Sequence, residues 1–200
     1  MSKTAYFEQK LITIIRHGMP EAHNKYSNWT ILRGSDLSEF INDWNNCELS
    51  LENKISDKLR VTIDDSDFFV TSKLRRTIDS SRLLGIMKAD TSELLNEAEL
   101  PHGFLKNIRM PVILWGGVIR LAWVFGLRMN AESYKEFKTR IKKACTYISL
   151  QSVKSNHIAV IGHGFANMQI KKELKRNKWK HIENCGGYDY WSFDTFEKSN

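Results

Sequence analysis

Two short apolar runs constrain the fold of this chain more than any other feature. Residues 11–15 read LITII and residues 157–161 read HIAVI, and each run ends at a turn that contains glycine. A short apolar run that is bounded by a turn is typical of a strand buried on both faces, as in a parallel sheet. A sheet of that kind needs helices on both sides, so the sequence predicts an α/β fold.

Helical patterns alternate with the predicted strands. Asp36 and Glu39 form a capping-box start, followed by apolar residues on one helical face up to Trp44. We expect further helices at 51–59, 74–84, 134–148 and 164–175, and further strands at 68–71 and 188–193. This alternation predicts a three-layer sandwich with a mainly parallel central sheet flanked by helices.

Length and composition favour one compact unit. The 200 residues are 42% hydrophobic and 26% charged, which is ordinary for a folded domain. We expect a single domain over residues 1–200, with a helical cap insertion at about residues 102–130. The apolar stretch at 110–127 contains Arg120, so we interpret it as a buried helix and not as a membrane span.

The net charge and the cysteine spacing limit the kinds of ligand and site that the chain can have. Thirty Lys and Arg against 23 Asp and Glu give a net charge of +7, which favours anionic partners without choosing among them. We interpret the basic residues at 171–180 as solvated surface. Cys47, Cys145 and Cys185 are too widely spaced for a zinc site or a disulfide framework. The N-terminus shows no export signal, so we expect a cytoplasmic protein.

Arginine and histidine follow three predicted strands. They occur as Arg16-His17-Gly18, as Arg75-Arg76 and as Gly162-His163-Gly164. Ligands of open parallel sheets bind outside the carboxyl ends of the strands. Guanidinium groups match phosphate oxygens, and an imidazole can act as a nucleophile or as a cationic donor. This set predicts phosphoryl-transfer chemistry that needs no metal.

Four segments carry a family resemblance. LITIIRHG, FFVTSKLRRTIDSS, LLNEAE and HIAVIGHG resemble the successive motifs of the histidine phosphatase superfamily, in its phosphoglycerate mutase-like branch. The resemblance runs in the family's order from about residue 11 to residue 164. It implies a phosphoglycerate mutase-like fold and a metal-independent enzyme without a cofactor.

The resemblance also implies roles for individual residues. His17 would be the nucleophile that forms a phosphohistidine, and Arg16 would hold the phosphoryl oxygens. Arg76 would be the second phosphate clamp, with Arg75 beside it as the spare. His163 would complete the pocket and stabilise charge in the transition state.

The general acid and the inner substrate contacts are less closely defined. The family pattern selects Glu97 as the acid, and Glu99 stays open as the alternative. Residues 19–20 are Met and Pro, where the family commonly has Glu followed by Thr or Ser. Asn24 is the candidate substrate-binding residue, with His23 as a second candidate.

We therefore expect a phosphatase that acts on a phosphorylated small molecule or phosphoprotein. The alternative is a phosphomutase or sugar-bisphosphate phosphatase of the same superfamily, and a non-catalytic module that binds a phosphorylated ligand ranks last. We expect no nucleic-acid partner and no integral membrane span. The Trp and Gly content of the cap suggests an apolar surface and a large or lipid-like leaving group. The sequence leaves the oligomeric state open.

Overall fold

The computed structural model describes residues 9–129 and 131–198, and a six-stranded sheet forms its centre. The strand order is β4-β3-β6-β1-β8-β7. Parallel pairing joins β1 (Lys10–Arg16), β6 (His157–Gly162), β3 (Phe68–Thr71) and β4 (Asp90–Thr91). The last two strands, β7 (Lys180–Cys185) and β8 (Phe193–Lys198), are antiparallel to their neighbours. The mainly parallel α/β sheet is confirmed.

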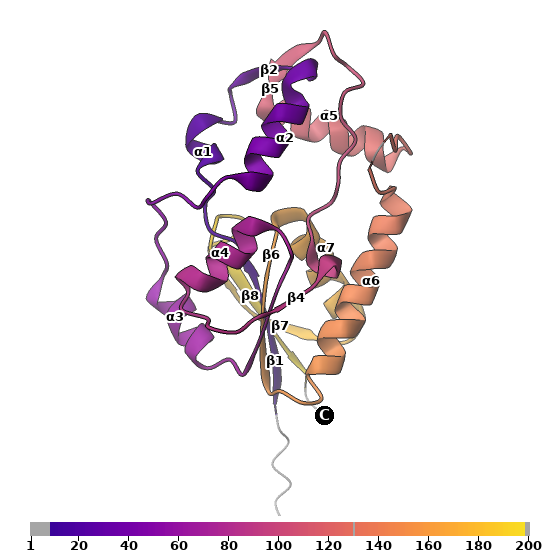
Figure 1. Ribbon diagram of the computed structural model, residues 1–200. Helices are drawn as coiled ribbons and strands as arrows, with labels where there is room; N and C mark the ends of the chain where they lie inside the picture. Colours follow the sequence, from indigo (N-terminus) through magenta and orange to yellow (C-terminus); the bar gives the residue numbers. More distant parts are fainter. Residues whose placement is uncertain (1–8, 130, 199–200) are drawn as a thin grey trace, which may run out of the picture.

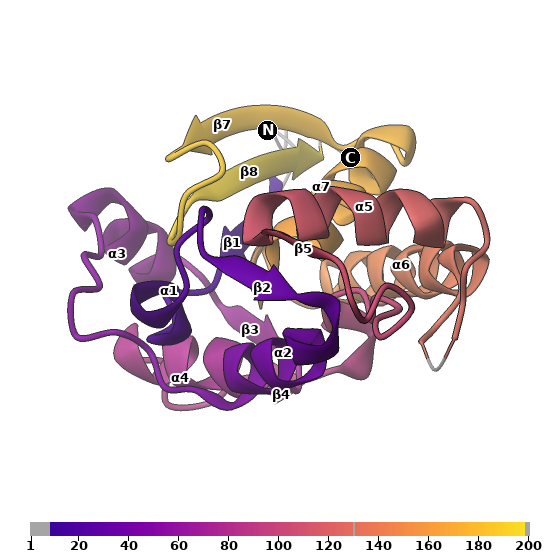
Figure 2. The same ribbon diagram turned by 90° about the horizontal axis from the view of Figure 1, so that it is seen from above.

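Helices cover both faces of the sheet, as seen from above in Figure 2. On one side, α6 (Tyr134–Gln151) and α7 (Gly164–Arg176) pack against Ile12 and Ile14 of β1. On the other side, α3 (Asp57–Asp64) contributes to a cluster that contains Ile15, and α4 (Arg75–Leu83) lies on the same side. Alternate residues of β1 thus serve opposite cores, which is the period of two that a doubly covered strand requires.

A cap lies beyond the carboxyl ends of the parallel strands, at the top of Figure 1. One part contains α1 (Ala22–Lys25), β2 (Ile31–Arg33), the 3-10 helix η1 (Gly34–Asp36) and α2 (Leu37–Asn46). The other contains β5 (Arg109–Pro111) and α5 (Val112–Val124). Strands β2 and β5 pair antiparallel, and Leu37 packs with Trp115 and Ile119. The segment predicted as a cap therefore packs against a second segment; residue 130 lies outside the described residues.

Two tryptophans of α5 are part of the protein's interior. Trp115 and Trp123 are buried, and the indole N–H of each donates to a main-chain carbonyl, of Leu32 and Glu132 respectively. The sequence-based suggestion that tryptophan marks an apolar substrate surface does not apply to these two side chains. No helix in the described part of the chain is both long and apolar enough to cross a membrane.

Two predicted elements were wrong in position. The helical period at 51–59 does not form a helix until Asp57, where Ser56 caps α3 by accepting the N–H of Leu59. Leu51 is fully exposed, so its apolar character has no partner in a helix. The helical spacing of the apolar residues at 51–59 therefore does not correspond to one helix.

The predicted strand at 188–193 is a turn, and β8 begins only at Phe193. Gly186 and Gly187 adopt φ values of +80° and +59°, which suit glycine and end the preceding strand. The preceding strand is β7, which begins at Lys180, the last residue of the segment that was interpreted as basic surface. It is an edge strand with alternating exposed and half-buried residues, so it has no apolar run to reveal it.

A buried carboxylate ties this antiparallel edge to α7. Asp194 on β8 accepts hydrogen bonds from Lys171 (2.6 Å), His181 (2.8 Å) and Asn184 (3.0 Å). Burial by itself raises the pKa of Asp194, but the hydrogen bonds from Lys171 and Asn184 outweigh it, so the pKa lies below its usual value. The ionised form of Asp194 therefore stabilises the folded state.

We predict that Asp194→Asn lowers the free energy of unfolding by roughly 1 to 3 kcal/mol at neutral pH, because Lys171 loses its charged acceptor. The depressed pKa means that this contribution is complete above about pH 4 and is lost as the pH falls through the folded-state value. Denaturant unfolding at several pH values measures it. Asp64→Asn, at an exposed position on α3, is the matched control. A difference between Asp194→Asn and wild type that persists at low pH would contradict the assignment.

Candidate active site

His17 follows β1 and is almost completely buried. Its main-chain N–H donates to the carbonyl of Gly162 at the end of β6 (3.0 Å). Its ring Nδ1 lies 2.7 Å from the carbonyl oxygen of Gly18. Since a carbonyl oxygen only accepts, Nδ1 carries the proton and Nε2 keeps a free lone pair. The chain thus holds His17 in the tautomer in which Nε2 could act as a nucleophile.

The turn after His17 has room only for glycine. A Cβ on Gly18 would lie 2.4 Å from the indole of Trp191, and the N–H of Gly18 donates to Ser80 on α4 (2.9 Å). Asn53 accepts from the N–H of Met19 and from the indole N–H of Trp191, both at 2.6 Å. Neighbouring elements therefore fix the turn from several sides.

His163 follows β6 and faces His17, with ring centroids 5.2 Å apart. Its Nδ1 accepts from Nε of Arg76 (3.1 Å), so the proton lies on Nε2, which donates to Oγ of Ser72 (2.7 Å). Burial, followed by the positive charge of Arg76, holds the pKa of both His17 and His163 well below the usual value. Both imidazoles are accordingly neutral near pH 7.

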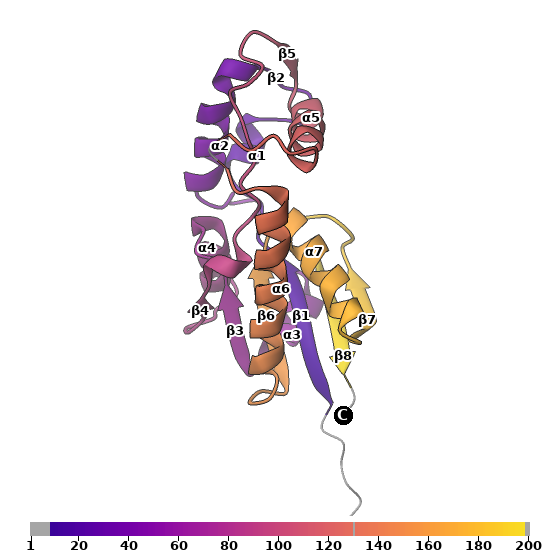
Figure 3. The ribbon, with the colours of Figure 1, turned by 90° about the vertical axis from the view of Figure 1, so that its right-hand side faces the viewer.

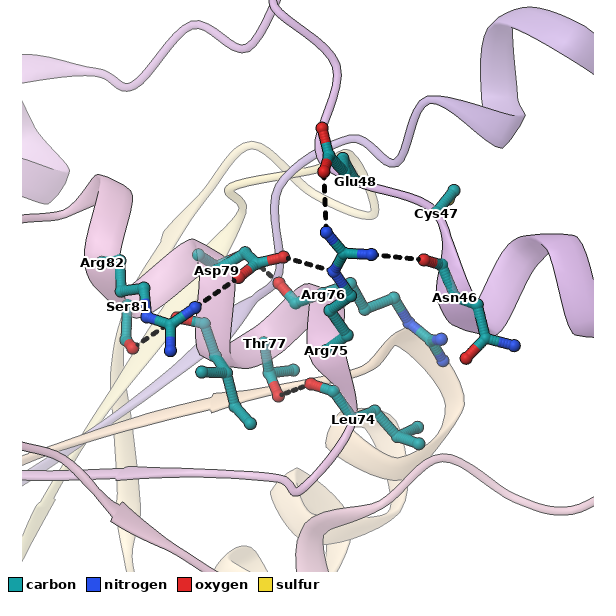
Figure 4. A network of polar contacts seen from close by, with 12 residues as sticks. Asn46, Cys47, Glu48, Leu74, Arg75, Arg76, Thr77, Asp79, Ser81 and Arg82 are labelled. Carbon is teal, nitrogen blue, oxygen red and sulfur yellow. Dashed lines mark hydrogen bonds and ion pairs between the residues drawn. The ribbon is translucent and has the colours of Figure 1, made fainter.

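The two adjacent arginines of α4 have different surroundings. Arg76 is buried and donates to Asn45 on α2 (2.9 Å) as well as to His163. Figure 4 shows Arg75 held on the other side by Asp79, Glu48 and the carbonyl of Asn46, with Arg76 extending away from that group. The structure thus brings Arg76, and not Arg75, to the paired histidines.

Arg16 lies beside the same histidines. Its guanidinium packs over the ring of Tyr190, 4.4 Å from the centroid, and donates to the carbonyl of Tyr188. Its Nε is buried and has no hydrogen-bond partner among the described residues. A buried N–H without a partner is costly, and a phosphoryl oxygen would satisfy it.

Glu97 reaches the site from the loop after the 3-10 helix η2 (Glu93–Leu95). Its carboxylate accepts the N–H groups of Phe165 (3.1 Å) and Ala166 (2.9 Å) in the first turn of α7, directly after His163. The N-terminus of a helix carries a partial positive charge, which stabilises a carboxylate. Glu99 is exposed, so the structure places Glu97, and not Glu99, next to the histidines.

Arg140 of α6 holds the loop that carries Glu97. It donates to the carbonyls of Leu94 (3.0 Å), Asn96 (2.8 Å) and Glu97 (3.3 Å), and its charge is paired with Glu132. Three carbonyls on one guanidinium leave the loop little freedom. We interpret Arg140 as a positioning residue for Glu97.

The predicted substrate contacts lie on α1. Asn24 is exposed and donates to Glu21 and Ser50, and it has no described contact with the histidines or arginines of the site. His23 lies closer to them through Tyr190: its Nδ1 is 3.4 Å from the hydroxyl of that tyrosine, whose ring centroid is 5.7 Å from that of His17.

Sequence reasoning missed Tyr190, Asn45 and Arg140. Tyr190 lies in a loop without a motif, and it reaches His17 only because β8 returns beside β1. Asn45 lies on a surface helix of the cap, where an amide is unremarkable. Ser72 was within reach of sequence analysis, since it lies in the serine-containing strand end that precedes Arg75.

Metal and thiol chemistry have few candidate residues here. The described residues include no group of three or more His, Cys, Asp or Glu side chains that could hold a metal ion. The cysteines Cys47, Cys145 and Cys185 are free thiols.

Comparisons with known proteins support the fold. No family model matches the sequence, and no curated protein matches it. A phosphoglycerate mutase from Bacillus anthracis has a TM-score of 0.60 at 16% identity, over 96% of this chain and 89% of that one. A mycobacterial glucosyl-3-phosphoglycerate phosphatase has a TM-score of 0.57 at 16% identity, over 96% and 97%. A phosphoserine phosphatase from Entamoeba histolytica gives 0.55 at 14% identity, over 96% and 95%.

These structures share little sequence with the chain, so the likeness concerns the backbone. Its sheet, the helices on both faces and the coverage of almost the whole chain agree with theirs. The chain has a phosphoglycerate mutase-like α/β fold.

Proposed function

We propose that the protein is a phosphatase that hydrolyses phosphomonoesters through a covalent phosphohistidine on His17. One observation supports this above all others. His17 is a buried, neutral imidazole whose Nδ1 proton is held by the carbonyl of Gly18, which leaves Nε2 as a free nucleophile beside Arg76 and His163. A neutral nucleophile close to fixed positive charge is what attack on a phosphate dianion requires.

In the first step, Nε2 of His17 attacks phosphorus in line with the leaving oxygen. The bond between phosphorus and that oxygen breaks as the nitrogen–phosphorus bond forms. Arg16 and Arg76 hold the non-bridging oxygens, and the partnerless Nε of Arg16 supplies one of the donors. Glu97 in its protonated form donates a proton to the leaving oxygen.

In the second step, water takes the place of the alcohol. Glu97, now a carboxylate, accepts a proton from the water as its oxygen attacks phosphorus. The nitrogen–phosphorus bond breaks, inorganic phosphate leaves, and His17 and Glu97 return to their starting states. The hydrogen bonds from Phe165 and Ala166 keep the carboxyl group in one orientation through both steps.

His163 contributes through its protonation state. In the free protein both ring nitrogens are engaged, one with Arg76 and one with Ser72. The negative charge of a bound phosphomonoester opposes the effects that lower the pKa of His163, so binding favours the protonated ring. The second N–H forms on Nδ1, so it can donate to a phosphoryl oxygen once Arg76 releases that nitrogen and turns to the phosphate.

The substrate class follows from the site and from the similar folds. Arg16 and Arg76 provide donors for one phosphoryl group. The leaving group would face the side of the cap that carries His23 and Asn24. A phosphorylated small molecule or a phosphoprotein fits these features. The solved structures with this fold include phosphatases described for glucosyl-3-phosphoglycerate and for phosphoserine.

We predict that His17→Asn lowers kcat/KM for an aryl phosphate at least about 1000-fold, because no other group replaces the nucleophile. Adding EDTA leaves the wild-type rate unchanged. Circular dichroism and thermal unfolding serve as controls for folding of the variant. Hydrolysis by folded His17→Asn at the wild-type rate, or loss of the wild-type rate with EDTA, would contradict the proposal.

The role of Glu97 is tested by the leaving group. Glu97→Gln should lower kcat/KM, which reports the first step alone, about 100-fold or more for an alkyl phosphate, whose leaving alcohol needs a proton, and far less for a nitrophenyl phosphate. Glu99→Gln, two residues away and exposed, is the matched control and should show neither effect. If Glu99→Gln shows the dependence on leaving group and Glu97→Gln does not, the two assignments are reversed.

A further inference from the structure

Helix α5 of the cap has an apolar face that no other part of the described chain covers. Its inner face buries Trp115, Ile119 and Trp123. Its outer face, continued by the residue after the helix, exposes six large apolar side chains by between 37% and 84%: Ile113, Leu114, Val118, Leu121, Val124 and Phe125. With about 100° per residue, these six span an arc of roughly 140° opposite the buried three. They form one continuous surface.

The apolar surface extends beyond both ends of the helix. At the start, the N–H groups of Val112 and Ile113 donate to the carbonyls of Thr30 and Asn28, which places the strongly exposed Trp29 beside the first turn. Beyond the last turn, Met129 is also exposed. Figure 3 shows α5 at one side of the cap, opposite α2. Soluble proteins seldom expose an apolar patch of this length without a partner.

The segment that contains α5 carries charges of a single sign. Between Glu99 and Glu132 the sequence contains no Asp or Glu, whereas it contains Lys106, Arg109, Arg120 and Arg128. These four basic residues are exposed, and Arg128 has one ion pair, with Glu136 of α6 (3.1 Å). An apolar face that is flanked by basic residues matches a surface that is apolar inside and negatively charged outside.

We propose that the outer face of α5, together with Trp29, binds the surface of an anionic lipid bilayer. The helix lies in the plane of the interface, with its aliphatic side chains among the acyl chains and the arginines at the lipid phosphates. Trp29 contributes the amphipathic ring that favours this depth. The 13 residues of α5 are too few to span a bilayer, which needs about 20, so binding is peripheral.

A second copy of the chain fits this face less well. A symmetric dimer through α5 would bring the same basic segment of both copies together, and residues 100–131 contain no carboxylate to compensate. An anionic bilayer supplies the missing negative charge. The proposal does not depend on the phosphatase chemistry, because none of these side chains belongs to the candidate active site.

The test is co-sedimentation of the full chain with vesicles of phosphatidylcholine and phosphatidylserine, compared with vesicles of phosphatidylcholine alone. The double variant Leu114→Gln/Leu121→Gln removes two apolar side chains from the face without changing the charge. Leu150→Gln/Val153→Gln is the matched control, since both side chains are exposed and lie at the other end of α6 from the cap. Circular dichroism and thermal unfolding check that each variant is folded.

We expect the wild type and the control to bind the anionic vesicles, with weaker binding at high salt. We expect the α5 variant to bind about tenfold or more weakly. Absence of wild-type binding would overturn the proposal, as would equal binding by the α5 variant. A dimer in solution that Leu114→Gln/Leu121→Gln dissociates, without vesicle binding by the wild type, would assign the face to a second copy and would overturn it as well.

Discussion

The hydrogen bond between the main-chain N–H of His17 and the carbonyl of Gly162 joins the ends of the two central parallel strands. The candidate active site depends on this pairing. It places His17 and His163 after neighbouring strands, so their rings meet without any long loop. The residues that follow each histidine also contribute: the carbonyl of Gly18 accepts a hydrogen bond from Nδ1 of His17, and the first turn of the helix after His163 donates hydrogen bonds to Glu97.

Low dielectric surroundings explain why these groups suit phosphoryl transfer. Burial disfavours the charged form of an imidazole, and the nearby guanidinium groups disfavour it further. The site therefore keeps neutral imidazole nitrogen close to positively charged guanidinium groups. In the proposed mechanism, a phosphate dianion replaces the solvent that Arg16 and Arg76 have lost. Binding and activation of the nucleophile come from the same arrangement.

Sequence patterns predicted the parts of the molecule that depend on local order. The strands at 11–15, 68–71 and 157–161 showed because burial on both faces leaves an uninterrupted apolar run. The sequence also predicted that His17, Arg76 and His163 lie close together, because the carboxyl ends of parallel strands lie at the same edge of the sheet. Tyr190 could not be found in this way, since its contact with Arg16 depends on the path of the chain after β7. The same holds for Arg140, whose acceptors are carbonyls and leave no trace in sequence. The edge strand β7 was hidden because alternating exposure lets polar residues fill it.

The tautomer of His17 leads to the most direct measurement of the central claim. The protein is mixed briefly with an aryl phosphate, quenched under alkaline conditions that preserve phosphohistidine, and mapped by mass spectrometry and by phosphorus NMR. Since Nδ1 is held by the carbonyl of Gly18, we expect an acid-labile phosphoryl group on Nε2 of His17. A phosphoryl group on another residue, or turnover without any trapped phosphohistidine in wild type and in Glu97→Gln alike, would contradict the mechanism.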